Sequence, residues 1–148
     1  MDLRGDRERL FGNLADPETT QDFFRRVADD VDWTVEGTHP LAGRYRSKEA
    51  FVEETFGRLG RLMRDGARLE VRHLFLDGAT VIAELRAGST TLDGAPYDNT
   101  LCWVCRFDSA DVGAVIVEVR AYLDSAMVAW TIMRNEQLRA RGDAPTRT

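Results

Sequence analysis

The sequence predicts a single α+β domain in which helices cover one face of a mainly antiparallel sheet. Apolar residues recur at helical spacing through much of the first 65 residues. From residue 67 to residue 124 the pattern changes to alternating strands separated by turn dipeptides. A chain of 148 residues is long enough to bury a core without disulfides or a structural metal. We therefore expect one domain over residues 1–138, followed by a flexible polar tail over 139–148.

Three helices and a short strand are predicted for the N-terminal part of the chain. In the first segment, the residues that recur at helical spacing are Leu3, Arg7, Leu10, Phe11 and Leu14. Asp16 predicts the N-cap of a second helix, because its carboxylate can accept a hydrogen bond from a free backbone N–H group. The apolar stripe of that helix is Phe23, Phe24 and Val27. Period-two alternation predicts a strand over residues 31–35, and Ser47 predicts the cap of a third helix that ends at Asp65-Gly66.

Four longer strands and a last helix are predicted for the rest of the chain. The strands cover residues 67–76, 79–90, 96–108 and 114–124, and the helix covers 125–139. The dipeptides Asp77-Gly78 and Asp93-Gly94 are typical of the tight turns that join neighbouring antiparallel strands. We therefore expect an antiparallel meander with the helices packed on one of its faces.

The alternation gives two of these strands one apolar side and one charged side. The apolar side carries Val81, Ala83, Leu85, Val115, Val117 and Val119. The charged side carries Glu84, Arg86, Arg120, Tyr122 and Asp124. By default the apolar side of an antiparallel sheet is core and the charged side faces solvent. In the alternative arrangement, the charged side chains point into a pocket between the sheet and the helices, and a second subunit covers the aliphatic side.

Composition and cysteine spacing disfavour several classes of protein. A net charge of −5 argues against a nucleic-acid partner, and the absence of an export signal or a long apolar run predicts a cytoplasmic protein without a membrane partner. Cys102 and Cys105 fall on a strand, where residues three apart face opposite ways, so reduced thiols are expected. His39 and His73 lie far apart, and no phosphate-binding glycine loop occurs, so we expect no metal and no cofactor.

Three segments carry a resemblance that covers nearly the whole chain. They are residues 33–45, 97–107 and 116–127. These segments resemble the SnoaL-like branch of the nuclear transport factor two-like superfamily, which also holds ketosteroid isomerase and limonene epoxide hydrolase. The resemblance implies a cone-shaped fold, in which a strongly curved sheet wraps around the N-terminal helices and an internal hydrophobic pocket. It also implies a homodimer formed through the outer face of the sheet.

The resemblance implies a set of catalytic residues. Residues 119–124 resemble the last-strand segment of limonene epoxide hydrolase, whose final aspartate activates the attacking water, so Asp124 is implied as the general base. Its expected partners are Glu84, Arg86, Arg120 and Tyr122. The Glu84-x-Arg86 order is the reverse of the Arg-x-Asp pair in that family. From the residues alone, an aspartate followed by Ser125 and a helix is equally an N-cap, so both roles of Asp124 stay open.

Six further residues are candidates for contacts with a substrate. They are Trp33, His39, Phe56, Tyr97, Asn99 and Trp103. Flat aromatic faces suit a polyketide-, steroid- or terpenoid-like molecule, Asn99 offers a directional hydrogen bond, and His39 titrates near neutral pH. Two functions are consistent with these residues. One is an enzyme that abstracts a proton beside a carbonyl or activates a water, as isomerases, cyclases and hydrolases do. The other is a non-catalytic ligand-binding or dimerisation module.

Overall fold

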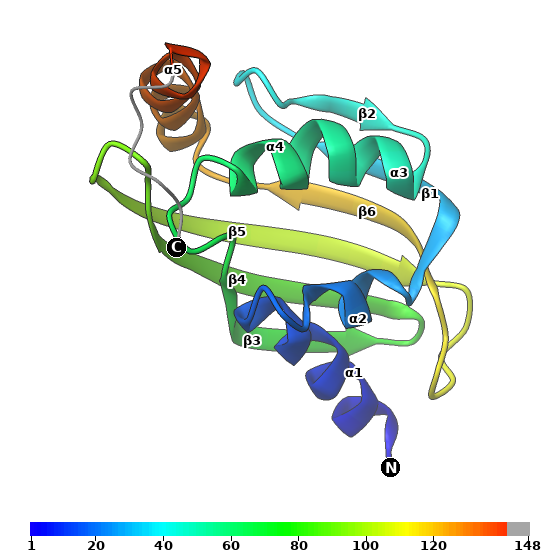
Figure 1. Ribbon diagram of the computed structural model, residues 1–148. Coiled ribbons are helices and arrows are strands. Elements are labelled where there is room, and N and C mark those ends of the chain that lie inside the picture. Colours follow the sequence, from blue (N-terminus) through cyan, green and yellow to red (C-terminus); the bar gives the residue numbers. More distant parts are fainter. Residues whose placement is uncertain (142–148) are drawn as a thin grey trace.

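A curved six-stranded sheet forms the frame of the protein, whose residues 1–141 are described by a computed structural model (Figure 1). The strands are β1 (Val27–Val35), β2 (Gly43–Tyr45), β3 (Leu69–Asp77), β4 (Thr80–Thr90), β5 (Pro96–Phe107) and β6 (Ile116–Tyr122). Their order across the sheet is β2-β1-β6-β5-β4-β3. The contact between β1 and β6 is parallel and every other strand pair is antiparallel. The predicted meander is therefore confirmed for β3 to β6, and the other edge of β6 pairs with the N-terminal strand β1.

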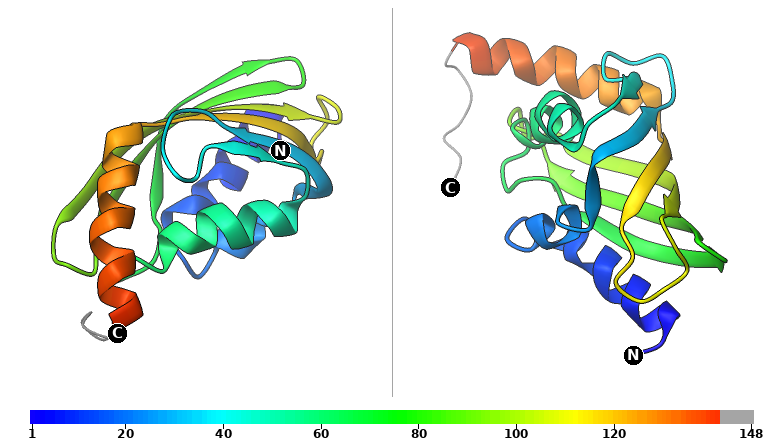
Figure 2. Two further views of the ribbon diagram at one scale, coloured as in Figure 1. Left: turned by 90° about the horizontal axis from the view of Figure 1, so that it is seen from above. Right: turned by 90° about the vertical axis from the view of Figure 1, so that its right-hand side faces the viewer.

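The helices lie on one face of this sheet, with one exception. They are α1 (Leu3–Gly12), the 3₁₀ turn η1 (Asn13–Ala15), α2 (Thr20–Phe24), α3 (Lys48–Phe51), the π-helix η2 (Val52–Phe56), α4 (Gly57–Gly60) and α5 (Ser125–Arg141). Figure 2 shows the sheet arching over α1, α2 and the α3–α4 segment, while α5 leaves the end of β6 and crosses one end of the sheet. None of the helices described in residues 1–141 has the length and apolar composition needed to cross a membrane.

The third predicted helix contains a π-helical turn. It begins at the predicted cap, where the Ser47 hydroxyl accepts a hydrogen bond from the Ala50 N–H group at 3.0 Å. Its regular turns are interrupted at η2, where the Gly57 N–H group donates to the Val52 carbonyl five residues earlier. A Cβ atom at Gly57 would lie 2.6 Å from that carbonyl oxygen. The π-turn therefore requires a glycine at this position.

The sheet face under the helices is the aliphatic one. Val81, Ala83, Leu85 and Val119 are at most 1% exposed in the core. The expectation that they belong to an exposed patch covered by a second subunit is therefore wrong, and the default arrangement is confirmed. Val115 and Val117 are half-buried, because an irregularity between Arg106 and Phe107 in the β5–β6 pairing shifts the register. Ile116, placed on the charged side by strict alternation, is fully buried as a result.

Several element boundaries differ from the sequence prediction. The second helix is only five residues long, and Val27 opens β1 instead of closing that helix. Strand β2, which was not among the predicted strands, lies between β1 and the third predicted helix and pairs with the end of β1. The last helix continues to Arg141, three residues into the predicted tail, and the remainder of that tail, 142–148, lies outside the described residues.

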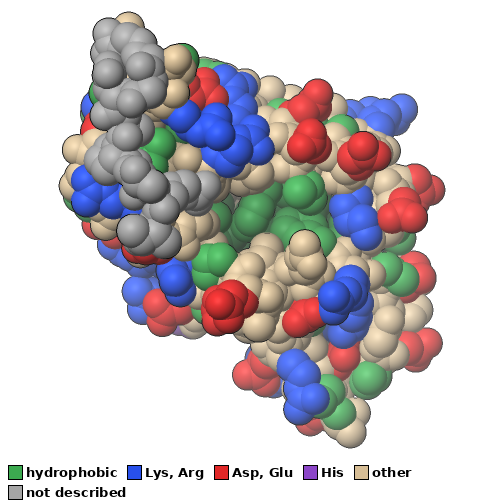
Figure 3. Space-filling view, in the orientation of Figure 1, with side chains coloured by type: hydrophobic (Ala, Val, Ile, Leu, Met, Phe, Trp, Pro, Cys, Tyr) green, Lys and Arg blue, Asp and Glu red, His purple; other side chains and the backbone are tan. Residues whose placement is uncertain are grey.

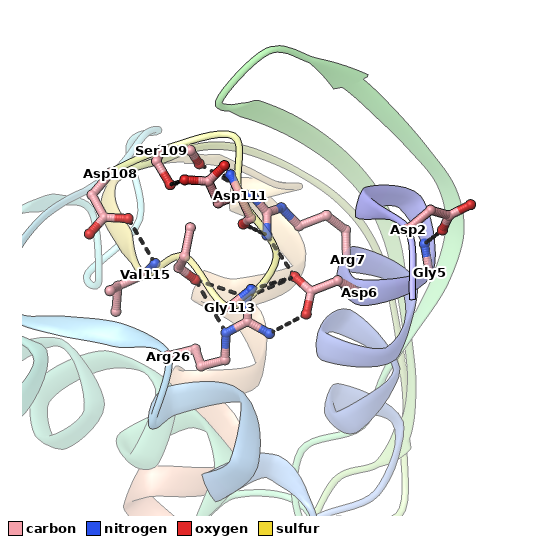
Figure 4. A network of polar contacts seen from close by, with 11 residues as sticks. Asp2, Gly5, Asp6, Arg7, Arg26, Asp108, Ser109, Asp111, Gly113 and Val115 are labelled. Atoms are coloured by element: carbon pink, nitrogen blue, oxygen red, sulfur yellow. Dashed lines mark hydrogen bonds and ion pairs between the residues drawn. The ribbon is translucent and has the colours of Figure 1, made fainter.

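A buried ionic network joins α1 to the start of β1 and to the β5–β6 loop (Figure 4). Asp6 accepts hydrogen bonds from Arg7 at 2.6 Å and from Arg26 at 2.8 and 3.0 Å. The Arg7 guanidinium also donates to the carbonyls of Asp111 and Ser109, and it lies 3.9 Å above the Phe107 ring. These bonds satisfy a carboxylate that would be costly to bury alone.

Candidate functional site

An apolar cavity of about 60 Å³ lies between the concave face of the sheet and the α3–α4 segment. Its walls include Trp33 of β1, Phe51 and Phe56 of the helical segment, and Leu101 and Trp103 of β5. Figure 3 shows hydrophobic side chains gathered at a hollow in the middle of one face of the molecule, with charged side chains around it. A concave apolar space with a few polar groups is the ordinary form of a small-molecule site.

Aromatic rings fix the shape of one wall of this cavity. The Trp33 indole stacks on Phe51 with ring centres 3.8 Å apart and planes inclined by 17°. Trp103 meets the same indole edge-on at 5.1 Å. Each ring is thus held by neighbours in favourable aromatic geometry, so the wall is rigid. Of the candidates for substrate contacts, Trp33, His39, Phe56, Tyr97 and Trp103 do line the cavity.

The sixth candidate, Asn99, is buried but is not part of the cavity lining, and it hydrogen-bonds to Tyr97. Its side-chain amide donates to the Tyr97 hydroxyl at 3.0 Å, and its carbonyl oxygen accepts from the Asp124 N–H group at 3.0 Å. A second, longer bond joins the amide to the Asp124 carbonyl. Within residues 1–141 the Tyr97 hydroxyl makes no other hydrogen bond, so its own hydrogen is free to donate.

Burial makes ionisation of Tyr97 less favourable than that of a free phenol, which is itself neutral at physiological pH. It raises the pKa of Tyr97 to about 12, although the Asn99 hydrogen bond acts in the opposite direction. The nearby negative charge of Asp124 raises this pKa further. At physiological pH the phenol is therefore protonated and keeps one O–H hydrogen to donate.

His39 lines the cavity in a fully hydrogen-bonded state. Its Nδ1 atom accepts from the Leu41 N–H group at 3.1 Å, so its Nε2 atom carries the hydrogen and donates to the Glu36 carbonyl at 3.1 Å. Burial lowers the pKa of His39, which favours this neutral form. Proton transfer by His39 would need one of these two bonds to break first.

The predicted catalytic cluster does not enter the cavity. Glu84, Arg86, Arg120 and Tyr122 lie on the outer, solvent-facing side of the sheet, so the expected inward orientation is wrong. The cluster is also divided, because β5 separates β4 from β6 in the sheet. Across these three strands, Glu84 of β4 is in register with Cys102 of β5, and Cys102 is in register with Tyr122 of β6. Neighbouring strands are about 4.8 Å apart, so the two halves lie roughly 10 Å from one another.

Each charged member of this cluster has a local partner instead. Glu84 pairs with His73 at 3.0 Å across β3 and β4. Arg86 lies 3.4 Å from Asp98, and Arg120 lies 3.8 Å from Glu118. All of these pairs are exposed, where an ion pair contributes little to stability. The geometry is that of a solvated sheet face.

Asp124 is observed in the second of its two possible roles, as a helix cap. Its Oδ1 atom accepts hydrogen bonds from the N–H groups of Ala126 and Met127, at 3.1 and 3.2 Å, at the start of α5. The residue is exposed and is not part of the cavity lining. Its link to the cavity is indirect and runs through the backbone bonds to Asn99.

The fold matches solved structures over almost its full length. An NTF2-like protein from Burkholderia thailandensis superposes with a TM-score of 0.70, covers 89% of this chain and 98% of its own, and is 25% identical. The chain belongs to the nuclear transport factor two-like (NTF2-like) superfamily. The cone-shaped α+β fold implied by the resemblance is thereby confirmed. No protein-family model matches the sequence.

Two curated relatives of this NTF2-like chain are named dimerizing cyclases. Dimerizing cyclase phiC, from a fungal species, is 32% identical over 130 residues, which cover 86% of this chain and 55% of the relative. Dimerizing cyclase tstC from Talaromyces stipitatus is 32% identical over 123 residues, covering 80% and 53%. The chain thus spans about half the length of the curated relatives it matches.

Three polar residues of this NTF2-like cavity were missed from the sequence. Thr55, Arg68 and Ser89 all belong to its lining. Thr55 occurs among apolar residues at helical spacing and is indistinguishable from a core threonine in the sequence. Arg68 directly precedes β3 and Ser89 lies near the end of β4, where polar residues are common, so no pattern marked them.

Proposed function

We propose that this NTF2-like protein is a SnoaL-like pocket enzyme of the cyclase type, acting on an apolar, carbonyl-containing molecule bound in the cavity. The observation that carries the proposal is the Tyr97–Asn99–Asp124 chain of hydrogen bonds. These bonds hold the neutral phenol of a cavity-lining residue in place, and the phenol O–H hydrogen has no acceptor among the described residues. The relatives named dimerizing cyclases support the same class of reaction.

Tyr97 would act by polarising the carbonyl group of the ligand. When a nucleophilic carbon of the same substrate attacks a carbonyl carbon, negative charge gathers on the carbonyl oxygen. A donor already aimed at that oxygen in an apolar, water-poor cavity stabilises the charge without having to reorganise. Asn99 supplies this orientation, because its amide occupies the acceptor side of the phenol and leaves the O–H bond to point elsewhere.

Proton abstraction by a carboxylate has less support than polarisation. Within the described residues, no aspartate or glutamate lines the cavity. His39 lines it, but both of its ring nitrogens are engaged. The proposed step therefore uses the enol form of the substrate. As the enol carbon bonds to the carbonyl carbon, the C=O π bond opens and the enol O–H proton passes to the carbonyl oxygen, so no protein base is needed, and the hydrogen bond from Tyr97 stabilises the negative charge that gathers there.

Replacement of Tyr97 by phenylalanine tests this role. The variant Tyr97→Phe should fold and bind ligand, yet lower kcat about 100- to 1000-fold, as loss of one aimed donor does. Tyr122→Phe is the matched control, because Tyr122 is 44% exposed on the outer face. Cyclisation of a panel of linear polyketones, followed by mass spectrometry, provides the readout. Unchanged turnover of an accepted substrate by Tyr97→Phe would refute the role.

A non-catalytic ligand-binding module is the second candidate. The absence of a carboxylate from the described lining favours it. Both candidates bind an apolar ligand, and only the enzyme converts it. If the protein binds a ligand saturably and the ligand is recovered unchanged after long incubation, the binding module is the correct function.

We also propose a homodimer through the outer face of the sheet. Phe75 and Tyr122 are 53% and 44% exposed on this face, among the ion-paired side chains. Light scattering at micromolar concentration should give twice the mass of the chain. The double variant Phe75→Asp/Tyr122→Asp should then give a monomer, and a monomeric wild-type protein would contradict the proposal.

A further inference from the structure

The loop between β1 and β2, residues 36–42, forms part of the cavity wall. His39 and Leu41 of this loop line the cavity and are 6% and 2% exposed. The cavity of about 60 Å³ is small, because an apolar cavity that binds benzene measures about 150 Å³. A ligand with even one aromatic ring therefore needs a segment of the wall to move before it can enter.

Both ends of this loop have backbone conformations that favour glycine. Gly37 has a φ angle of +122° and Gly43 one of +149°. Gly43 also pairs with the end of β1, so the base of the loop is fixed. Between the two glycines, the Ala42 N–H group donates to the His39 carbonyl at 3.1 Å, in a turn whose second residue is Pro40. This turn can therefore move as one unit about the glycines at its two ends.

The His39 ring fastens this turn in its closed position. Its Nε2–H group donates at 3.1 Å to the carbonyl of Glu36, which directly precedes Gly37. Its Nδ1 atom accepts at 3.1 Å from the Leu41 N–H group within the turn. The ring thus connects the two sides of the Gly37 hinge and holds Leu41 at the cavity.

Two other hydrogen bonds of the described chain attach the turn to neighbouring residues. The Tyr45 hydroxyl of β2 donates to the Leu41 carbonyl at 2.8 Å. The Thr38 N–H group donates to the Ser125 hydroxyl oxygen at 3.3 Å, where the loop lies beside the start of α5 (Figure 2). Within residues 1–141, opening of the turn therefore breaks only these two bonds besides those of His39.

Burial is the main influence on the protonation of the His39 ring. The titratable side chains on the segments around it are those of Glu36, Tyr45, Tyr97 and Asp124. Within residues 1–141 none of these side chains forms a hydrogen bond or an ion pair with the ring. Burial lowers the pKa of His39 below its ordinary value of 6.5, and the bond to the Glu36 carbonyl acts in the opposite direction. A ring released into water returns to the ordinary value.

Protonation of His39 is incompatible with the closed position of the turn. A second proton, at Nδ1, would point at the Leu41 N–H group, so two donors would face one another and the bond would be lost. The proton binds more tightly to the solvated ring of the open form than to the buried ring. By linkage, a fall in pH below 6.5 therefore shifts the loop toward the open form.

We propose that the turn between Gly37 and Gly43 is a lid on the cavity, which neutral His39 holds closed and protonated His39 releases. The lid admits a ligand at low pH and retains it when His39 is neutral. This inference goes beyond the proposed function, because an enzyme and a binding module both need an entrance to the cavity.

Amide hydrogen exchange of the ligand-free protein tests the role of His39. The Leu41 N–H group, which bonds to His39, should exchange at least about fivefold faster at pH 5 than at pH 7.5, after correction for the intrinsic pH dependence of exchange. Ile116 is fully buried and its N–H group bonds to the Arg26 carbonyl, so its exchange reports global unfolding and should keep its protection.

Two variants of His39 separate its hydrogen bond from its protonation. The side-chain oxygen of His39→Asn can accept from the N–H group two residues further on, as in an Asx turn, but the amide does not titrate. Leu41 exchange should then be slow and independent of pH. His39→Ala lacks the bond, so Leu41 should exchange as fast at pH 7.5 as it does in the wild-type protein at pH 5. His73→Asn is the matched control, because His73 is exposed on the outer face of the sheet, and it should keep the wild-type response.

Benzene is a neutral probe of the open lid, because the closed cavity is too small for it. Its binding can be followed through the indole N–H resonances of Trp33 and Trp103, which line the cavity. Since apparent affinity rises with the populated open fraction, we expect at least about fivefold tighter binding at pH 5 than at pH 7.5. In His39→Asn the two affinities should be equal.

Four results would overturn the inference. The first three are Leu41 exchange that does not depend on pH, an acid response that persists in His39→Asn, and an equal rise in the exchange of Ile116. The fourth is absence of benzene binding at pH 5, because the open turn would then not lead into the cavity. None of these measurements involves turnover, so their outcome is independent of the Tyr97→Phe test of the proposed function.

Discussion

The guanidinium of Arg26 donates two hydrogen bonds, at 3.0 and 2.8 Å, to the carboxylate of Asp6, and this pair links the first helix to the residue just before the first strand. The carboxylate also bonds to Arg7, whose side chain has no exposed surface. One acid therefore neutralises two cations that lie at the end of the sheet. The geometry makes Asp6 the central residue of this network.

Removal of the Asp6 charge should destabilise the protein strongly. In Asp6→Asn the buried Arg7 loses its counter-charge, and uncompensated buried charges cost about 3–5 kcal/mol. Asp22→Asn is the matched control, because Asp22 pairs with Arg25 on an exposed surface, where little change is expected. Urea unfolding of both variants measures the difference. Equal free energies of unfolding would contradict the structural importance of the network.

Acid should remove the same stabilisation. The hydrogen bonds from Arg26, chiefly, hold the pKa of Asp6 at about 2, below its ordinary value of 3.8. A carboxyl whose folded-state pKa is depressed stabilises the fold above its unfolded pKa, and that stabilisation is lost as pH falls. The Asp6 contribution should therefore be complete at neutral pH and decline between about pH 4 and pH 2. The difference in unfolding free energy between wild type and Asp6→Asn should shrink over that interval.

The π-turn should depend on Gly57. An added Cβ in Gly57→Ala meets the Val52 carbonyl oxygen, so the turn must shift, at a cost typical of overpacking, about 1–3 kcal/mol. At Gly60 the nearest atom to an added Cβ is 3.7 Å away, so Gly60→Ala should be neutral or stabilising. Thermal unfolding compares the two variants. A Gly57→Ala protein as stable as Gly60→Ala would mean that the backbone adjusts freely.

Substitutions at Asp124 should separate capping from catalysis. Asp124→Asn keeps a side-chain oxygen that can accept from Ala126 and Met127, so both stability and turnover should change little. Asp124→Ala removes the cap and should cost about 1 kcal/mol. Turnover measured on folded protein decides between the two roles. A large loss of kcat in Asp124→Asn at unchanged stability would restore Asp124 as the general base.

The fold was predictable because its signals are local. Ser47 caps its helix as expected, and the alternation in β4 divides core from solvent correctly. The irregular pairing near Ile116 was not predictable, because strict alternation carries no sign of a skipped residue. That irregularity moved Ile116 into the core and left Val117 half-buried.

The site was predicted only in part, because pocket placement depends on which strands are neighbours. Trp33, Tyr97 and Trp103 are correctly identified as lining residues, since large aromatics in a small fold tend to reach its interior. Glu84 and Arg120 share the charged side of their strands, as the alternation predicts, but β5 lies between the two strands and keeps them apart. The Asn99–Tyr97 bond follows from their shared strand face, whereas the anchoring of Asn99 by the Asp124 backbone required the three-dimensional arrangement.

The parallel pairing of β1 with β6 sets the order in which the protein can be assembled. During synthesis, β1 leaves the ribosome some 80 residues before its partner, so one of its two edges remains open until Tyr122 has emerged. Contacts of such long sequence separation slow folding and expose an unpaired strand meanwhile. The wall that carries Trp33 is thus completed late, and a nascent chain that stalls before β6 would be a natural client for chaperones.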